Sequence, residues 1–170
     1  MMKMKKIFVI VVCGLIVANL VAQERDSTRN KWTNEFGFHA GSTTGIGLSY
    51  RYWPKKLGVQ FTILPVKSPD ETFVSVGLTA LYSIYNSRHI HFYGYLGNTV
   101  LVNNYKRYYY FTDDDSYERV HSTKYNIGFG PGFGVGTRVR FNIMLGYGFY
   151  DVTDEFNIYP AGEMGLYFRF

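Results

Sequence analysis

Apolar and polar residues alternate one by one along most of the chain beyond residue 31. The alternation is clearest over residues 124–136, where apolar residues, mostly aromatic or aliphatic, hold the odd positions and glycine holds most of the even ones. A period of two places the two kinds of residue on opposite faces of a β-strand. No segment in this part of the chain shows a sustained 3.6-residue period, so the pattern predicts an all-β protein.

The same period divides the chain into eight predicted strands. They span residues 32–41, 45–53, 57–64, 73–84, 89–102, 124–136, 139–150 and 157–170. The strand at 89–102 is the least regular, because aromatic residues occupy both of its faces. Pro131 cannot donate a ladder hydrogen bond, so it predicts a bulge or a strand end within the sixth strand.

The predicted connections between these strands alternate in length. Three connections are tight turns: 54–56, 86–88 and 136–138. The four connections at the other end are 42–44, which is short, and 65–72, 103–122 and 151–156, which are longer. Membrane barrels show this alternation, because their periplasmic turns are short and their extracellular loops are longer. The lengths therefore favour a barrel that crosses a membrane.

The composition of the two faces predicts which one contacts lipid. The polar face consists mainly of Gly, Ser, Thr and Asn, whereas a soluble barrel of the lipocalin type would need Lys and Glu there. Small polar residues suit the narrow interior of an eight-stranded barrel, and lipid requires a closed sheet without unpaired edges. The apolar face is therefore predicted to point outward. Six aromatic residues near strand ends are predicted to form girdles at the membrane interfaces: Tyr50, Tyr52, Trp53, Tyr147, Phe149 and Phe168.

The N-terminal segment predicts export. Residues 1–6 carry three lysines, and an apolar run over residues 7–22 ends abruptly in polar sequence. This is the pattern of a secretory signal peptide cleaved after residue 22; an uncleaved anchor is the alternative, although the run is short for a membrane-spanning helix. Cys13, the only cysteine, lies in this segment, so the mature chain would lack disulfides. A short periplasmic segment (23–31) and one barrel domain (32–170) would follow.

The remaining composition narrows the range of partners. The aromatic share of 19% and the 18 glycines do not suit an ordinary helical core. The formal net charge of +5 falls to about +2 once the three lysines of the predicted signal peptide are removed. No stripe of Lys and Arg remains, so nucleic acid is not an expected partner.

The last strand carries a family resemblance. Met164, Leu166, Phe168 and Phe170 share one face, and the strand ends on an aromatic residue. It resembles the terminal strand by which outer-membrane barrels of Gram-negative bacteria are recognised for assembly. Together with the glycine–aromatic repeats, the whole mature chain resembles the small outer-membrane barrels of the OmpA-transmembrane-domain and OmpX type, including those common in the Bacteroidetes.

This resemblance implies an eight-stranded antiparallel up-and-down transmembrane β-barrel in the outer membrane of a Gram-negative cell. Leu166, Phe168 and Phe170 would be the assembly signal read by the barrel-assembly machinery. The expected partners of the folded protein are outer-membrane lipids and lipopolysaccharide, and the expected state is a monomer. The resemblance implies no cofactor.

Several charged residues are predicted to face the bore: Glu35, Arg51, Arg140, Glu163 and Arg169. The first, second and eighth strands become neighbours when the barrel closes, so Glu35, Arg51 and Glu163 could meet, and pairing would offset their desolvation. We expect a polar plug. By resemblance to the OmpA-type interior, the alternative is a gate that passes ions when a pair breaks.

The segment 103–122 is rich in tyrosine and carries three consecutive aspartates. Tyrosine offers a large contact area at a low entropic cost, so this segment is predicted to bind an extracellular ligand that the sequence does not identify, unless part of it extends the strands. The binding candidates are Tyr108, Tyr109, Tyr110, Asp113, Asp114 and Asp115. The acidic residues lack the spacing of a calcium loop, so we predict no dedicated metal site but a solvated acidic tip that divalent ions could bridge to lipopolysaccharide phosphates. A calcium site formed with the acids of the 151–156 loop is the alternative.

Histidines and serines raise the possibility of a lipid A-modifying enzyme: His39, His89, His91 and His121 with Ser42, Ser83 and Ser122. A catalytic triad is recognised by geometry rather than by sequence position. His89 and His91 follow a short turn and are placed at the periplasmic end, and His121–Ser122 lacks a third partner at a recognisable spacing. We therefore expect a structural or surface-interaction role, adhesion-like and without catalysis. The enzyme and a narrow ion-conducting pore are the alternatives.

Overall fold

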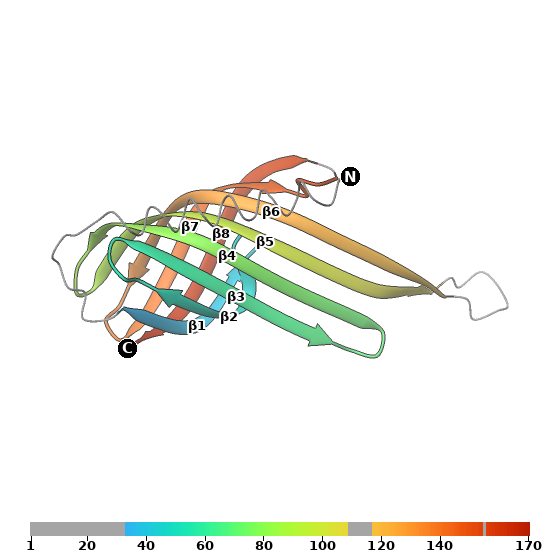
Figure 1. The fold of residues 1–170 in the computed structure, drawn as a ribbon, viewed down its shortest axis with the longest axis horizontal. Coiled ribbons are helices and arrows are strands. Elements are labelled where there is room, and N and C mark those ends of the chain that lie inside the picture. The colour runs from blue at the N-terminus through green and yellow to red at the C-terminus, as the bar shows by residue number, and fades with distance from the viewer. Residues whose placement is uncertain (1–32, 109–116, 155) are drawn as a thin grey trace.

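The computed structural model describes the chain at residues 33–108, 117–154 and 156–170. Eight antiparallel strands follow one another in chain order and close into a barrel (Figure 1). They are β1 (Asn34–Gly41), β2 (Gly45–Tyr52), β3 (Leu57–Lys67), β4 (Glu71–Asn86), β5 (Ile90–Tyr108), β6 (Tyr117–Val135), β7 (Val139–Tyr150) and β8 (Asn157–Arg169). The predicted eight-stranded antiparallel barrel is confirmed.

Pairing of β1 with β8 closes the ring. The paired segments run from Glu35 opposite Arg169 to Ala40 opposite Met164. Beyond them, Phe170 N donates to Asn34 O at 2.9 Å. The predicted signal peptide (1–22) and periplasmic segment (23–31) lie outside the described residues. Within the residues that are described, no helix is long and apolar enough to cross a membrane.

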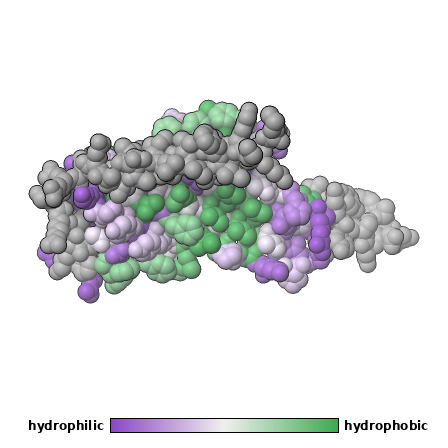
Figure 2. Space-filling model, viewed as in Figure 1, coloured by the Kyte–Doolittle hydropathy of each residue, from purple (hydrophilic) through white to green (hydrophobic). Residues whose placement is uncertain are grey.

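The apolar face of the sheet points outward, as predicted. Phe38 is 67% exposed, whereas the next residue, His39, is 3% exposed. The same contrast recurs along the other strands, and Figure 2 shows apolar surface across the middle of the barrel with polar surface toward the end where β5 and β6 project. Successive residues of a strand point to opposite faces, so this alternation follows from the period of two in the sequence.

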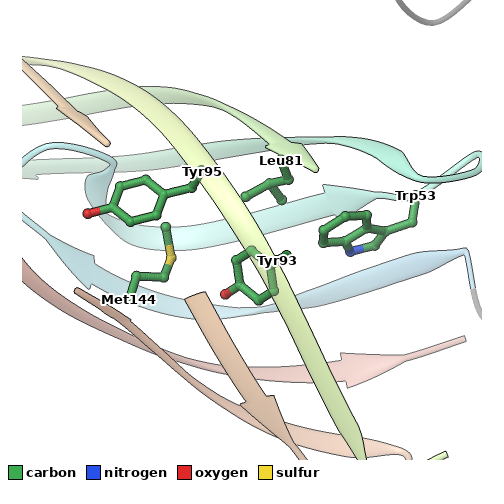
Figure 3. Close-up of a cluster of buried hydrophobic side chains, with 5 residues drawn as sticks. All are labelled: Trp53, Leu81, Tyr93, Tyr95 and Met144. Carbon is green, nitrogen blue, oxygen red and sulfur yellow. The ribbon is translucent and has the colours of Figure 1, made fainter. Parts of the chain in front are cut away.

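Large side chains fill part of the bore. Trp53, Leu81, Tyr93, Tyr95 and Met144 form a buried cluster (Figure 3). The prediction that Trp53 belongs to an outer girdle is wrong, because it is 2% exposed and its ring lies 5.7 Å from that of Tyr93. Tyr93 and Tyr95 also explain the irregular pattern of β5, since its inner face carries aromatic residues as well as its outer face.

The strands differ greatly in length. β5 and β6 pair from Ile90–Val135 out to Tyr108–Tyr117, whereas β6 pairs with β7 only as far as Ile127–Phe149. The predicted loops 65–72 and 103–122 are therefore too long, because strand structure occupies much of each. Figure 1 shows β5 and β6 extending well past the other strands. The outer ends of β3 to β6 (residues 64–67, 71–74, 101–108 and 117–124) are called the projecting sheet below.

Pro131 lies inside β6 and does not end it. It pairs with Gly94 of β5, and the β6–β7 register is the same before and after it, so the predicted bulge is absent from β6. The ladder toward β7 has a gap from Gly130 to Pro131, where a proline offers no N–H. The irregularity of register lies in β4 instead, between Ser83 and Tyr85.

Candidate functional site: two carboxylates in a filled bore

Glu35 of β1 is surrounded by guanidinium groups in the bore. Its carboxylate lies 3.1 Å from Arg169 Nε, 3.4 Å from Arg140 Nη1 and 3.9 Å from Arg51 Nη1. The strand register produces this arrangement, since Glu35 pairs with Arg51 across β1–β2 and with Arg169 across β1–β8. All four residues are buried. One negative charge therefore faces three positive charges.

Neutral neighbours stabilise the excess positive charge. Arg51 Nε donates to Gln60 Oε1 at 2.6 Å, and the guanidinium carbon of Arg51 lies 4.0 Å from the centre of the Tyr167 ring. A guanidinium over an aromatic face is attracted by the negative charge density of that face. Gln60 and Tyr167 thus replace part of the solvation that water would give to an exposed arginine.

A serine and a histidine lie next to this cluster. His91 Nε2 is 2.9 Å from Ser83 Oγ, and Arg140 Nη1 donates to His91 Nδ1 at 2.9 Å. An arginine can only donate, so Nδ1 must be the acceptor and the ring proton of a neutral His91 is on Nε2. Nε2–H then donates to Ser83 instead of accepting its proton. This geometry does not activate Ser83 as a nucleophile.

Glu163 of β8 holds the turn between β1 and β2 inside the bore. Its carboxylate accepts hydrogen bonds from Thr43 N at 3.0 Å and from the hydroxyl groups of Thr43 and Thr44. His39 Nε2 lies 3.5 Å from the same carboxylate and 2.6 Å from Thr44 Oγ1. Thr43 and Thr44 are both 0% exposed. The 42–44 turn is therefore an inward plug at the mouth of the bore.

Glycines make room for this plug. A Cβ atom at Gly77, Gly97, Gly128 or Gly148 would approach atoms of Thr43 or Thr44 to 2.8 Å or less. Real Cβ atoms essentially never come this close to other heavy atoms. These four positions on β4 to β7 are called the glycine collar below, and the plug explains why each of them is glycine.

Further hydrogen bonds hold the plug from the opposite wall. Asn126 Nδ2 donates to Ser42 O at 2.9 Å, and Ser42 Oγ lies 2.9 Å from Tyr150 Oη. Asn126 Oδ1 also accepts from Asp151 N at 3.0 Å. The plug is thus fixed to β6, β7 and β8, and the loop that follows β7 is tied to the same wall.

The five charged residues that were expected in the bore form two separate groups in the structure. All five are buried, but Glu35 gathers the three arginines, whereas Glu163 lies among His39, Thr43 and Thr44. The part played by the two threonines was not foreseen. The sequence contained one indication of this role: 42–44 is the shortest of the four connections predicted at this end of the barrel.

The other predicted residues are placed as follows. Tyr108 pairs through its backbone with Tyr117; Tyr109, Tyr110, Asp113, Asp114 and Asp115 lie outside the described residues. Leu166, Phe168 and Phe170 face outward. His121 and Ser122 are consecutive in β6 and so point to opposite faces of the sheet. Among the described residues, no group of three or more His, Cys, Asp or Glu side chains could hold a metal ion.

A closed ring of strands with an apolar exterior and a polar, filled interior defines an eight-stranded transmembrane β-barrel. Three solved structures are similar. They are the N-terminal β-barrel domain of Pseudomonas aeruginosa OprF (16% identity, 81% of this chain and 95% of that chain, TM-score 0.46), Yersinia pestis outer membrane protein Ail (18%, 81% and 97%, 0.40) and Neisserial surface protein A (20%, 81% and 93%, 0.37). No protein-family model matches the chain, and no curated protein is similar to it in sequence.

Proposed function

We propose that the protein is an integral outer-membrane barrel that presents the projecting sheet to an extracellular partner and neither conducts ions nor catalyses a reaction. The tight turns 53–56, 87–89 and 136–138 then lie on the periplasmic side, because short turns mark that side in such barrels. The projecting sheet lies at the opposite, extracellular end. A rigid, filled barrel is a suitable base for a surface that must stay fixed outside the membrane.

The contents of the bore support the absence of conduction. The plug at 42–44, the aromatic cluster around Tyr93 and the ion cluster around Glu35 all fill the bore, and the last two are in contact, since Arg51 Nη1 donates to Tyr93 Oη at 3.3 Å. Each consists of buried side chains that contact one another. An ion would have to displace all three, whereas a single broken ion pair would open only one of them.

The open edge of β6 is the observation that carries the proposal of binding. From Arg119 to Lys124, β6 pairs with β5 on one side. On its other side, pairing with β7 stops at Ile127, and a further backbone bond joins Val152 N to Tyr125 O. Within the described residues, no backbone hydrogen bond reaches that side of β6 between Arg119 and Lys124. Unpaired N–H and C=O groups on a sheet edge can accept a strand from another protein.

The side chains of this edge restrict the partner. Arg119 and Lys124 are exposed and positively charged. Like charges facing each other would oppose pairing of two copies through this edge. An extended segment that bears acidic residues would be complementary. The proposed binding mode is therefore addition of an acidic strand to β6.

Paired deletion of residues 103–106 and 119–122 tests this function. These residues are register partners, from Asn103–Ser122 to Lys106–Arg119. Removing four residues from each strand shortens the hairpin and leaves every remaining side chain on the same face of the sheet. Cells that display the shortened protein should lose attachment to an immobilised basement-membrane extract, while the barrel still assembles. The matched control replaces Arg119 and Lys124 with glutamine and keeps the strand; it should weaken attachment without abolishing it.

Amide hydrogen exchange distinguishes strand addition from contact through side chains. The amides of Arg119–Lys124 that point away from β5 should exchange rapidly in the free barrel and become protected when the extract is bound. Attachment that survives the paired deletion, or that leaves these amides unprotected, would contradict the proposal.

A further inference from the structure

Positively charged residues occupy the outward face of the projecting sheet, just beyond the apolar belt. The continuous apolar belt on β3 to β6 ends at Pro65, Val74, Val102 and Tyr125, and the next outward charged residues are Lys67, Lys106 and Arg119. His121 lies on the same face. By the alternation of the strands, none of the outward positions from residue 64 to 67, 71 to 74 or 101 to 106 carries an acid.

The spacing places these cations near the headgroups of the outer leaflet. Lys67 is two residues beyond Pro65 and Lys106 is four beyond Val102. At about 3.3 Å per residue, these steps are roughly 7 and 13 Å along tilted strands. The polar layer on each side of a bilayer is only about 5–8 Å thick. Lys67 therefore lies within this layer. Lys106 and its register partner Arg119 lie at its outer limit or in the sugar layer above it.

A groove at the same place offers a polar cavity of about 350 Å³. Its lining includes Lys67, Lys106 and Arg119 together with Asp70 and Glu71. Lys106 Nζ lies 2.9 Å from Asp70 Oδ1, and the side chains of Lys106 and Asp70 are 24% and 59% exposed. A pair with one partner this exposed contributes less energy than a buried pair, and a phosphate carries more charge than the carboxylate with which it would compete.

The opposite side of the same rim has the opposite charge. The loop after β7 carries Asp151 and Asp154. An anionic ligand would therefore meet attraction on the side of β3 to β6 and repulsion on the side of β7 and β8. This asymmetry indicates a local site on the projecting sheet; a ring of charge around the barrel would not show it.

We propose that Lys67, Lys106 and Arg119 bind the phosphate groups of lipid A in the outer leaflet. Arg119 offers a planar fork that matches two phosphate oxygens, and the lysines act as point charges. The apolar belt directly below would contact the acyl chains of the same molecule. The inference shares with the proposed function the placement of the projecting sheet outside the cell and the residue Arg119, but it does not require a protein partner.

Native mass spectrometry of the detergent-purified barrel tests the site. Diphosphoryl lipid A is titrated against the wild type, the triple variant Lys67→Gln/Lys106→Gln/Arg119→Gln and a control variant, Lys55→Gln/Lys56→Gln/Arg138→Gln. The control removes the same charge from the turns at the other end. The triple variant should bind about 100-fold more weakly, since each of the three cations near an anionic surface contributes about a factor of five. The control should bind as the wild type does.

Three results would overturn the inference. Equal binding of dephosphorylated lipid A would show that the acyl chains alone are recognised, and equal weakening by both triple variants would show an effect of overall charge. Phosphatidylglycerol held equally tightly by the same three residues would refute the assignment to lipid A. If the triple variant fails to fold, Lys67→Gln alone should weaken binding about fivefold. These lipid-binding measurements do not depend on attachment to basement-membrane extract, so the inference and the proposed function can fail separately.

Discussion

Glu35 and Glu163 are both buried carboxylates inside the barrel, on the adjacent strands β1 and β8, but their surroundings differ. Glu35 faces three guanidinium groups, whereas Glu163 faces a backbone N–H, two hydroxyl groups and an imidazole. Glu35 therefore compensates charge that would otherwise be buried without a partner. Glu163 positions a turn. The same residue type stabilises the barrel in one place and closes its mouth in the other.

The largest expected effect is that of Glu35→Gln. It leaves three buried guanidinium groups without a negative charge, and breaking a buried ion pair by removing one partner costs about 3–5 kcal/mol. The free energy of unfolding, measured in urea by the gel mobility of the folded barrel, should fall by this amount. Glu163→Gln is the comparison, and a loss as large as that of Glu35→Gln would contradict the distinction between the two carboxylates.

A substitution in the glycine collar should have the next largest effect. The Cβ of Gly128→Val would overlap Thr43, so the plug must move, at a cost of about 1–3 kcal/mol for an overpacked interior. Gly94→Val is the matched control, because a Cβ there meets nothing within 4 Å. The same urea titration should show no loss for Gly94→Val. Equal losses would mean that strand glycines matter in general and that the plug has no special part.

Glu163→Gln should loosen the plug with a smaller loss of stability, about 1–2 kcal/mol, because the amide oxygen still accepts some of the hydrogen bonds. The amide of Thr43 should exchange about tenfold faster, which corresponds to about 1.4 kcal/mol. The exchange of Arg51 and Gln60 amides in the same sample serves as the reference. Unchanged exchange at Thr43 would show that Glu163 does not hold the turn.

The smallest expected effect is on conductance. Glu163→Gln should leave planar-bilayer current at the baseline of the wild type, since the cluster around Tyr93 and the ion cluster around Glu35 still fill the bore. Discrete current steps in the variant, and not in the wild type, would instead support a gate at Glu163.

Much of the fold was predictable because it rests on a local pattern. The eight strands and the outward apolar face follow from alternation alone, and the bounds of β7 (Val139–Tyr150) are those expected. The outer ends of β5 and β6 were predicted only as an alternative to a loop, because polar residues occupy both faces once the strands leave the membrane. Alternation of hydrophobicity then disappears, although backbone pairing continues as far as Tyr108–Tyr117.

The site was only partly predictable because it depends on depth within the bore. The inward facing of Glu35 and Glu163 follows from the period of two, but their separation depends on where each strand lies along the barrel axis. The plug depends on a turn that folds inward, which requires the glycine collar on four other strands. Trp53 was misplaced because an aromatic residue at a strand end was assigned to the interface although its position put it on the inner face.

The outward placement of the apolar face in lipid can be measured by cysteine labelling. Leu96→Cys and Arg119→Cys are made separately, with Cys13, the only native cysteine, replaced by serine. Both positions are exposed in the structure, but the account places Leu96 in hydrocarbon and Arg119 in water. In liposomes, a membrane-impermeant maleimide should label Arg119→Cys and leave Leu96→Cys unmodified, while a lipid-soluble maleimide labels both. Rapid labelling of Leu96→Cys by the impermeant reagent would show that water, and not lipid, surrounds the barrel.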